Sequence, residues 1–313
     1  MSSRVPIRTS NAAWPATKAR LSVLVPFLRD DPCILIAALG QQTLVRSGEV
    51  ELVLFDDGTN DSALTAAVKA AIHACALPTL LVSSPINLGR SKGRNQLVQA
   101  ARAEWFLFLD GDMLPDGPDF LQTYLDMVEA SAPAVVFGGF SLLQAPPLPE
   151  HDLHRSMALA SDCASIEQRQ QYPEKYVFTS NLLVRRDVLD QERFDEGFEG
   201  WGWEDVEWAM RVIRRHPIIH VSNPATHLGL DPPWLMARKY EQSAANFGRL
   251  VRDHLHIVER YPTYKMARIL KRFPLRGVWR PCLKGLALLE GAPLRLRALA
   301  MRLYRSALYA ETV

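Results

Sequence analysis

Two aspartates separated by a single glycine follow the most hydrophobic strand-like segment of the chain. Asp110, Gly111 and Asp112 come directly after Trp105–Leu109. Carboxylates at this spacing can reach a hard divalent cation and a diphosphate that the cation bridges, and the glycine lets the backbone approach a ligand closely. An acidic turn after a strand is also common as a plain solvated turn, so the triplet alone is a weak signal. Its position after an apolar strand favours a binding role.

A second acidic loop, residues 56–61, follows the segment Val50–Phe55. A carboxylate here could accept hydrogen bonds from the imide N–H of a uracil base or from ribose hydroxyls, with Asp57 the stronger candidate and Asp56 the second. The alternative is a turn that leads into a helix, and Asp61 is expected only to cap that helix.

A third segment, Asn87–Asn95, combines two glycines and three cations at the expected start of a helix. Backbone N–H groups at a helix N-terminus, together with a guanidinium group, form a favourable site for a diphosphate. The glycine spacing does not match a P-loop. Arg94 is the cation expected to face the ligand, whereas Arg90 and Lys92 could equally lie on the surface.

The segment Gly197–Trp208 is rich in glycine and tryptophan and contains several acidic residues. Exposed tryptophans stack on the apolar faces of sugar rings, and glycines allow such a loop to move as a lid. A carboxylate at the start of the following helix could remove a proton from an acceptor hydroxyl, and Asp205 is predicted to be this general base. The alternative is that Asp205 only caps the helix. The residues predicted to contact the acceptor are Trp201, Trp203, Glu204 and Asn181.

A histidine in the segment Ala225–Gly229 is the fifth candidate. A lone histidine is more often structural than a ligand, and nothing in its immediate sequence decides between the two. A metal held by carboxylate and phosphate oxygens would accept a neutral imidazole to complete its coordination shell. His227 is therefore a candidate metal ligand together with Asp112 and Asp110.

The elements around these segments predict an α/β fold. Strands are expected at Leu21–Phe27, Val50–Phe55, Leu80–Val82, Trp105–Leu109 and Asn181–Val184, and helices at 31–42, 62–75, 91–102 and 204–215. Strands that alternate with helices predict βαβ units and a mainly parallel sheet with both faces covered. Ligands of such sheets bind beyond the carboxyl ends of the strands, where the loops 26–31, 56–60 and 110–112 lie. From Pro146-Pro147 to Val177 the pattern is irregular.

The composition excludes several classes of protein. With 48% hydrophobic and 22% charged residues among 313, the chain is globular rather than disordered, and a net charge of +2 excludes a nucleic-acid binder driven by bulk electrostatics. Four dispersed cysteines without a CxxC pair exclude a zinc knuckle and a disulfide scaffold and predict a reducing compartment. Residues 1–20 lack an apolar core, and the longest apolar stretch, Cys33–Leu39, is too short to span a bilayer. A cytoplasmic protein is expected.

Positive charge gathers at the C-terminus. From Lys265 onward there are eleven basic and two acidic residues, a net charge of +9, while the preceding chain carries −7. Apolar and aromatic residues alternate with these cations, which predicts a peripheral contact with the anionic inner face of the cell membrane. The alternative is an amphipathic helix that packs on the rest of the protein with its cations in water.

Taken together, the motifs resemble those of the inverting GT-A glycosyltransferases of family 2, over roughly Leu21 to Gly229. The matching segments are the opening strand with Pro26, Asp56-Asp57-Gly58, Asn87-Leu-Gly-x-x-x-Gly-Arg-Asn95 and Asp110-Gly-Asp112. The stretch Trp201-Gly-Trp-Glu-Asp205 looks like the acceptor signature of galactosyltransferases, N-acetylgalactosaminyltransferases and bacterial chondroitin-type polymerases. Each motif is weak alone, but five in order form a specific set.

The resemblance implies a GT-A (Rossmann-like) domain over 20–258, with a nucleotide-sugar half (20–115) and an acceptor half (116–258). An N-terminal arm (1–19) would precede it and a basic amphipathic helical extension (259–313) would follow. The implied donor is a UDP-sugar and the implied cofactor Mn2+ or Mg2+. Asp112 and His227 would hold the metal, with Asp110 near the metal or the ribose. The implied donor-binding residues are Pro26, Phe27, Asp56, Asp57, Arg94, Asp110 and Gly111.

The resemblance also implies a reaction and a setting. Asp205 would be the base of an inverting transfer to a glycan or lipid-linked glycan acceptor in bacterial surface polysaccharide synthesis. Two other functions stay open at this point. A nucleotidyltransferase could use a similar sheet and metal carboxylates but would not need the Trp-Gly-Trp loop. A non-catalytic glycan-binding protein would keep the tryptophans but would have no use for Asp112 and His227 together. Oligomeric state is not predicted.

Overall fold

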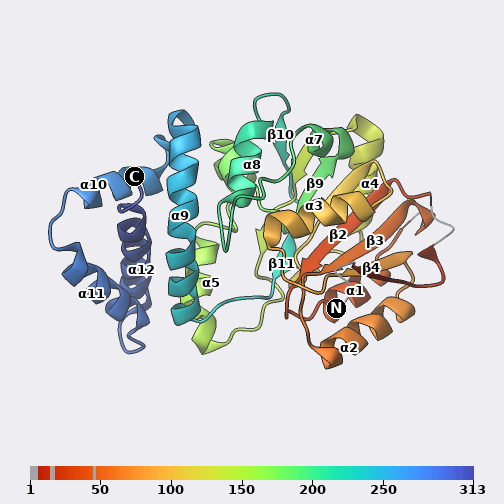
Figure 1. Cartoon of the computed structure of the whole chain (residues 1–313), viewed down its shortest axis with the longest axis horizontal. Helices are drawn as coiled ribbons and strands as arrows, with labels where there is room; N and C mark the ends of the chain where they lie inside the picture. The colour runs from red at the N-terminus through yellow and green to blue at the C-terminus, as the bar shows by residue number, and fades with distance from the viewer. Residues whose placement is uncertain (1–5, 15–17, 45–46) are drawn as a thin grey trace.

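The computed structural model describes residues 6–14, 18–44 and 47–313, so residues 1–5 and 15–17 of the predicted N-terminal arm lie outside the described residues. Its central feature is a sheet of eight strands with helices on both faces (Figure 1). Across the sheet the strands are β1 (Ile7–Ser10), β4 (Thr79–Ser83), β3 (Val50–Asp56), β2 (Leu21–Phe27), β5 (Trp105–Phe108), β9 (Leu182–Arg185), β7 (Val135–Phe137) and β10 (Ile218–His220).

The four strands β4, β3, β2 and β5 are parallel, as the alternation of strands and helices predicts. In their register Phe27 pairs with Asp56 and Asp56 with Ser83, so the carboxyl ends of β2, β3 and β4 lie level. β9 runs antiparallel between β5 and β7, and β1 adds an antiparallel edge strand beside β4. The predicted α/β class with a mainly parallel sheet is confirmed.

The sheet divides the core into two layers because successive side chains of a strand point to opposite faces. Val23 and Val25 join a cluster under α1 (Cys33–Gly40), α2 (Ser62–Ala74) and α4 (Phe120–Ser131), whereas Leu24 joins a cluster under α3 (Arg90–Ala100), α7 (Arg186–Gln191) and α8 (Glu204–Val212). Asp61 accepts the N–H groups of Ala63 and Leu64 and so caps α2 as expected. Helices thus cover both faces of the sheet, and the predicted binding loops lie at the edge formed by the strand ends.

A second, three-stranded sheet lies at that edge. It consists of β6 (Met113–Pro115), β11 (Ala225–His227) and β8 (Phe140–Ser141), with β11 in the middle. Because β6 starts directly after the Asp-Gly-Asp triplet, the pairing of β6 with β11 brings the ends of two distant segments together.

The segment 146–177, for which the sequence showed no regular pattern, is largely helical, so these helices were not predicted. It contains η3 (Pro149–His151), α5 (Asp152–Leu159), α6 (Ile166–Gln170) and η4 (Pro173–Tyr176). These elements are short and begin at local signals, such as the capping box of Ser165 and Gln168. Helices of one or two turns carry too few periodic positions to be recognised from apolar spacing.

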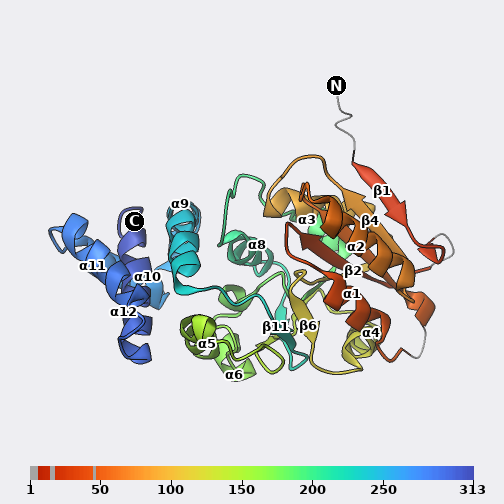
Figure 2. The same ribbon diagram turned by 90° about the horizontal axis from the view of Figure 1, so that it is seen from below.

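The C-terminal residues fold into a bundle that packs on α9 (Pro233–Val258), α5 and α8. α10 (Pro262–Lys271), α11 (Arg276–Leu288) and α12 (Leu294–Tyr309) lie beyond α9, and α12 packs against α9 and α5 (Figures 1 and 2). One hydrophobic cluster joins these helices to α5 and α8. The predicted extension 259–313 therefore shares a core with the residues before it. No helix in the described part of the chain is both long and apolar enough to span a membrane.

Candidate functional site

Asp112 and His227 face each other because β6 and β11 are paired. Met113, the first residue of β6, is the register partner of His227. This pairing places Nε2 of His227 3.3 Å from Oδ2 of Asp112. Burial works to lower the pKa of His227, but the charge and hydrogen bond of Asp112 outweigh it and the pKa is raised. Burial conversely works to raise the pKa of Asp112, and the imidazole nevertheless holds it below its usual value.

The surroundings of Asp112 fit a metal ligand. Its Oδ1 is buried and has no hydrogen-bond partner, a costly state that a bound cation would relieve. A Cβ at position 229 would collide with Oδ2, so only Gly229 leaves room for this carboxylate. In the described part of the chain no group of three or more His, Cys, Asp or Glu side chains is placed to hold a metal ion, so Asp110 does not complete a three-residue metal site. Asp112 and His227 would therefore share a cation with oxygens from a substrate or water.

Arg94 on α3 connects Asp110 with the start of α8, where the loop that begins at Gly197 ends. Its Nη1 lies 3.0 Å from both Oε1 of Glu204 and Oδ1 of Asp205, and its Nη2 lies 3.8 Å from Oδ1 of Asp110. Burial works to lower the pKa of the guanidinium, and these carboxylates hold it above its usual value. The diphosphate contact predicted for Arg94 is not supported by this placement, because the side chain is 3% exposed and paired with carboxylates. Arg90, 45% exposed, lies 3.9 Å from Glu204.

Asp205, the predicted base, is held from two sides. Beside Arg94, Thr179 donates its backbone N–H to Oδ2 and its hydroxyl to the carboxylate, each at 3.1 Å. Burial raises the pKa of Asp205 to about 6; Arg94 opposes the rise and Glu204 adds to it. A carboxyl group with such a pKa can take up a proton near neutral pH. Thr179 was missed from the sequence, where the only signal is the polar run 179–181 before β9.

The loop 56–61 packs closely on the chain that leads into the segment Asn87–Asn95; both were predicted to bind the donor. Gly58 has φ +82°, and a Cβ there would collide with the backbone of Ile86, so glycine is needed both for the turn and for the close approach. Asp57 accepts the N–H groups of Leu88 at 2.6 Å and Gly89 at 3.0 Å, and burial raises its pKa. Asp57 therefore orients the loop at the start of α3, and its predicted contact with a uracil stays a prediction.

Pro26, Phe27 and Gly111 meet at the carboxyl end of β2. A Cβ on Gly111 would contact Cβ of Phe27 at 3.4 Å and would lie 3.9 Å from the carbonyl oxygen of Pro26. The backbone N–H of Asp57 donates to the carbonyl of Phe27 at 3.0 Å, and Asp56 accepts the N–H of Thr59 at 2.9 Å. The fold thus brings the predicted donor residues of three loops to one edge of the sheet.

The tryptophan loop is less exposed than the sequence predicted. Trp203 has φ +76°, and its Nε1 donates to the hydroxyl of Tyr309 on α12 at 3.0 Å. Its ring also packs against Phe247 and Tyr309, at centroid distances of 5.0 and 5.9 Å. The acceptor contact predicted for Trp203 is therefore not supported, because the ring is part of the packing between α9 and α12. Trp201 lies 6.1 Å from Tyr240 by ring centroids and keeps a partly exposed ring.

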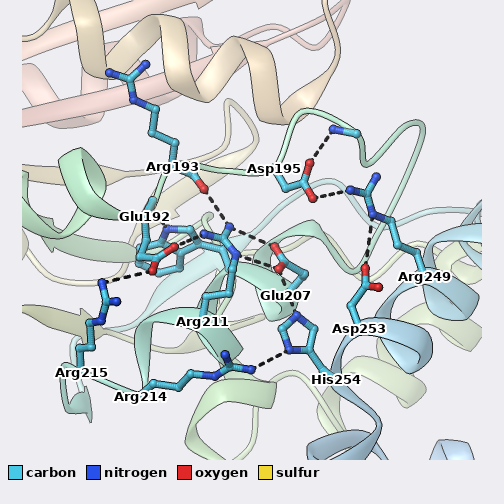
Figure 3. Close-up of polar contacts among 12 residues, drawn as sticks. Glu192, Arg193, Asp195, Glu207, Arg211, Arg214, Arg215, Arg249, Asp253 and His254 are labelled. Atoms are coloured by element: carbon cyan, nitrogen blue, oxygen red, sulfur yellow. Dashed lines mark hydrogen bonds and ion pairs between the residues drawn. The ribbon is translucent and has the colours of Figure 1, made fainter.

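A network of ion pairs ties the base of this loop to α9 (Figure 3). Asp195 lies 2.6 Å from Arg249, and Glu207 on α8 binds both Arg211 and His254, at 2.8 and 3.1 Å. Asn246 on α9 also donates to the carbonyls of Glu199 and Gly202 within the loop. These contacts join the loop to α9 at several points, and the lid motion expected from its glycines stays a prediction.

Asn181 is fully buried, with both ends of its amide engaged. Nδ2 donates to the carbonyls of Gly139 and Asn223 at 2.8 and 2.9 Å, and Oδ1 accepts from the hydroxyl of Tyr124 at 2.7 Å. The predicted acceptor contact does not fit this placement, because Asn181 uses its hydrogen-bonding groups to join β9 to the small sheet. Glu204, also predicted to touch the acceptor, is buried against Arg94.

Residues 22–193, which are more than half of the chain, match the model of the family described as Glycosyl transferase family 2. This chain belongs to glycosyl transferase family 2. A curated relative is validoxylamine A glucosyltransferase of Streptomyces hygroscopicus subsp. limoneus, 25% identical over 280 residues. The match covers 80% of this family 2 chain and 60% of the relative, so the chain spans less than two thirds of the relative's length.

Solved structures with the same fold include the mannosyltransferase PcManGT from Pyrobaculum calidifontis, in complex with GDP-Man and Mn2+. The TM-score is 0.60 at 16% identity, over 96% of this family 2 chain and 89% of the other. S. aureus TarS aligns with a TM-score of 0.53 at 16% identity, over 94% and 90%, and is also known in complex with UDP-GlcNAc. These similarities support the GT-A fold. The finer likeness to galactosyltransferases and chondroitin-type polymerases is not among them.

Proposed function

We propose that this protein is a metal-dependent inverting glycosyltransferase that moves a sugar from a UDP-sugar to a hydroxyl of a glycan or lipid-linked glycan. Membership of family 2 supports glycosyl transfer, and the Mn2+ complex of a structural neighbour supports the use of a divalent cation. One structural neighbour is known with GDP-Man and another with UDP-GlcNAc. The proposal of a uridine base in the donor therefore depends on the Asp56-Asp57 motif alone.

The observation that carries the proposal is the position of Arg94. One guanidinium approaches Asp110 on the donor side and Asp205 at the start of α8. The candidate base Asp205 and Asp110 at the candidate diphosphate site therefore both lie next to the side chain of Arg94. A nucleotidyltransferase or a glycan-binding protein gives no reason for a buried carboxyl of raised pKa at this position.

Residues at the donor edge would bind the nucleotide sugar. Asp112 and His227 would hold Mn2+ or Mg2+, which neutralises charge on the departing diphosphate when it is bound. Asp205 would take the proton of the acceptor hydroxyl as its oxygen forms a bond to C1. The bond from C1 to the diphosphate breaks on the opposite face, its electron pair leaves with the phosphate oxygen, and the anomeric configuration inverts.

Trp201 is proposed to contact the acceptor sugar. Its indole stays partly exposed, and Tyr240 and the ammonium of Lys239 lie 6.1 and 5.9 Å from its ring centroid. Such a ring offers an apolar face to the C–H groups of a pyranose. The loop and ion pairs behind it keep that face in place relative to Asp205.

The basic C-terminal helices are proposed to rest on the inner face of the cell membrane. Exposed apolar side chains and cations alternate on α10 and the turn after it, where Ile269, Phe273 and Leu275 are at least half exposed next to Lys271 and Arg272. Such a face suits an anionic surface and a lipid-linked acceptor. Flotation with vesicles of phosphatidylglycerol should retain the wild type and lose a Lys271→Glu/Arg272→Glu variant; equal flotation of both would contradict it.

The decisive test of the donor class is a thermal-shift series with UDP, GDP, CDP and their sugars, with and without Mn2+. A ligand that binds only the folded state raises the melting temperature. A metal-dependent shift with UDP compounds would support the proposal. A shift with GDP compounds alone would change the donor, and no shift with any nucleotide would overturn the function.

Asp205→Asn tests the reaction itself. Removing the base should lower kcat about 10²–10⁴-fold while the nucleotide-induced shift stays at its wild-type size. Asp187→Asn, an exposed carboxylate on α7, is the matched control and should keep wild-type activity. Near-wild-type turnover by Asp205→Asn would show that another group takes the proton.

A further inference from the structure

An ion pair between α9 and the segment before it has no role in the transfer reaction as proposed above. The ammonium of Lys239 on α9 lies 2.6 Å from Oδ2 of Asp231, which belongs to the segment between β11 and α9. The side chains of Lys239 and Asp231 are 28% and 11% exposed, so both stay partly accessible to a ligand. These two residues are called the Lys239–Asp231 pair below.

Asp231 is fixed in position relative to the candidate metal ligands. It lies on the same short segment as His227 and Gly229, and a Cβ on Gly229 would collide with Asp112. The backbone N–H of Asp231 donates to Nδ1 of His154 on α5 at 2.7 Å, and the ring centroid of His154 lies 6.1 Å from that of His227. The segment runs from β11 past α5 to the start of α9 (Figures 1 and 2). One end of the pair is therefore anchored beside Asp112 and His227.

Lys239 lies next to the tryptophan loop. Its ammonium is 5.9 Å from the ring centroid of Trp201, the partly exposed side chain that is proposed to contact the acceptor sugar. Sugar and cofactor sites generally combine an apolar surface with a few polar groups that fix the orientation of the ligand. A sugar that contacts Trp201 would therefore have hydroxyl groups within the reach of Lys239, on the side of the site that leads to Asp231.

The hydrogen-bonding capacity of the Lys239–Asp231 pair is only partly used. In the described part of the chain the ammonium and the carboxylate have only each other as side-chain hydrogen-bond partners, although an ammonium carries further N–H groups and a carboxylate further lone pairs. A hydroxyl group can accept from an ammonium and donate to a carboxylate at the same time. An anionic ligand is less suitable, because the carboxylate of Asp231 beside the ammonium would repel it.

We propose that Lys239 and Asp231 determine specificity by binding hydroxyl groups of a neutral sugar next to Trp201. This inference rests on the proposed function, because it names the substrate chemistry of the same site. The hydroxyls belong to the acceptor sugar or to the sugar being transferred, and the chemistry of recognition is the same for both. A site built to hydrogen-bond a hydroxyl discriminates strongly against an analogue that lacks it, because the polar groups of the protein are then left unpaired.

The first experiment measures sugar binding to the full-length protein in two arms. For the acceptor, the methyl glycosides of glucose, galactose, mannose and N-acetylglucosamine are titrated by ligand-observed NMR with UDP and Mn2+ present. For the transferred sugar, the affinities of UDP-glucose, UDP-galactose and UDP-N-acetylglucosamine are compared with that of UDP. In at least one arm a sugar should bind, and one of its monodeoxy analogues should bind about tenfold or more weakly. A sugar contribution in neither arm overturns the proposal.

Matched variants then locate the site. Lys239→Met should bind the sugar about tenfold more weakly and should no longer distinguish it from the deoxy analogue, since the hydrogen bond that the analogue lacks is already lost. A purely structural role would weaken both sugars equally and keep the discrimination. Arg238→Met, an exposed neighbour on α9, should behave like the wild type. If Lys239→Met fails to fold because Asp231 is left unpaired, the double variant with Asp231→Asn removes that charge and repeats the test. Wild-type discrimination in these site variants would overturn the assignment.

The two arms assign the sugar and separate this inference from the proposed function. A loss in the glycoside arm of Lys239→Met assigns the hydroxyls to the acceptor, and a loss only in the UDP-sugar arm assigns them to the transferred sugar. Absence of any metal-dependent nucleotide binding would overturn the proposed function, while the glycoside arm, repeated without nucleotide, would still test the pair. An intact transfer reaction in Lys239→Met with wild-type KM for both substrates would overturn the Lys239–Asp231 pair alone.

Discussion

The donor edge and the acceptor loop are built in different ways. The donor edge is made of loops that follow the parallel strands β2, β3, β4 and β5, and the ends of β2, β3 and β4 lie level through their register. The acceptor loop follows no such strand. It is fixed by residues from α9 and α12, namely Asn246, Tyr309 and the ion pair of Arg249 with Asp195.

This difference predicts which property a substitution in each region should change. Changes at the donor edge would remove a group that is proposed to contact the nucleotide or the metal, so they should act on binding and chemistry with little effect on the fold. Changes behind the acceptor loop should alter positions and stability first. The two halves meet at Arg94 and at the pair of Asp112 with His227.

The largest expected effect comes from Asp112→Asn. Loss of the carboxylate that is proposed to hold the metal should lower kcat/KM about 10³-fold and abolish the Mn2+-dependent part of the nucleotide-induced thermal shift. Asp119→Asn, on the exposed start of α4, should behave like the wild type in both measurements. A preserved metal-dependent shift in Asp112→Asn would exclude this carboxylate as a ligand.

Gly229→Ala tests the geometry of the donor edge without removing a ligand. The new Cβ would collide with Oδ2 of Asp112 and displace the carboxylate, so kcat/KM should fall about 100-fold. Gly277→Ala on α11 is the control, because no atom lies within 4 Å of its Cβ position. Wild-type kinetics in Gly229→Ala would mean that Asp112 need not stay where the structure places it.

The pH profile tests the candidate base, and the titration of His227, whose pKa is raised by Asp112, is expected to contribute over the same range. Burial raises the pKa of Asp205 to about 6, and its deprotonated form would be the base. Activity should therefore be present above about pH 6 and fall about tenfold per unit as the pH decreases below it. The measurement is log kcat/KM from pH 5 to 8, with the melting temperature followed over the same range. A flat profile in a protein that stays folded would argue against Asp205.

The smallest effect is expected from Tyr309→Phe. The variant loses the hydrogen bonds to Trp203 and Ser243, each worth about 1 kcal/mol, so the melting temperature should fall by a few degrees. KM for the acceptor should rise several-fold while nucleotide binding is unchanged. Tyr264→Phe on α10 serves as the control. A change in nucleotide binding in Tyr309→Phe would show that the two halves are coupled more tightly than their contacts suggest.

The sequence predicted the parallel strands and the donor loops because these depend on local patterns. Apolar runs such as Leu21–Phe27 and the turn residues after them are recognisable along the chain, and parallel pairing alone brings their ends together. The helices of 152–170 were missed, since they are too short for apolar periodicity. Thr179 was missed as well, because nothing near it in sequence indicates that its hydroxyl turns toward Asp205.

The sequence by itself was therefore enough to identify the motifs of the donor edge: the Asp-Gly-Asp triplet, the Asp56-Asp57 turn and the glycine-rich start of α3. Only the tertiary structure decided what their side chains contact. It turned Arg94 toward three carboxylates, buried Asn181, packed Trp203 against Tyr309, and folded the basic tail onto α5, α8 and α9. The physical reason is separation: a strand and its loop are neighbours in the chain, whereas Trp203 and Tyr309 are 106 residues apart and meet only through packing.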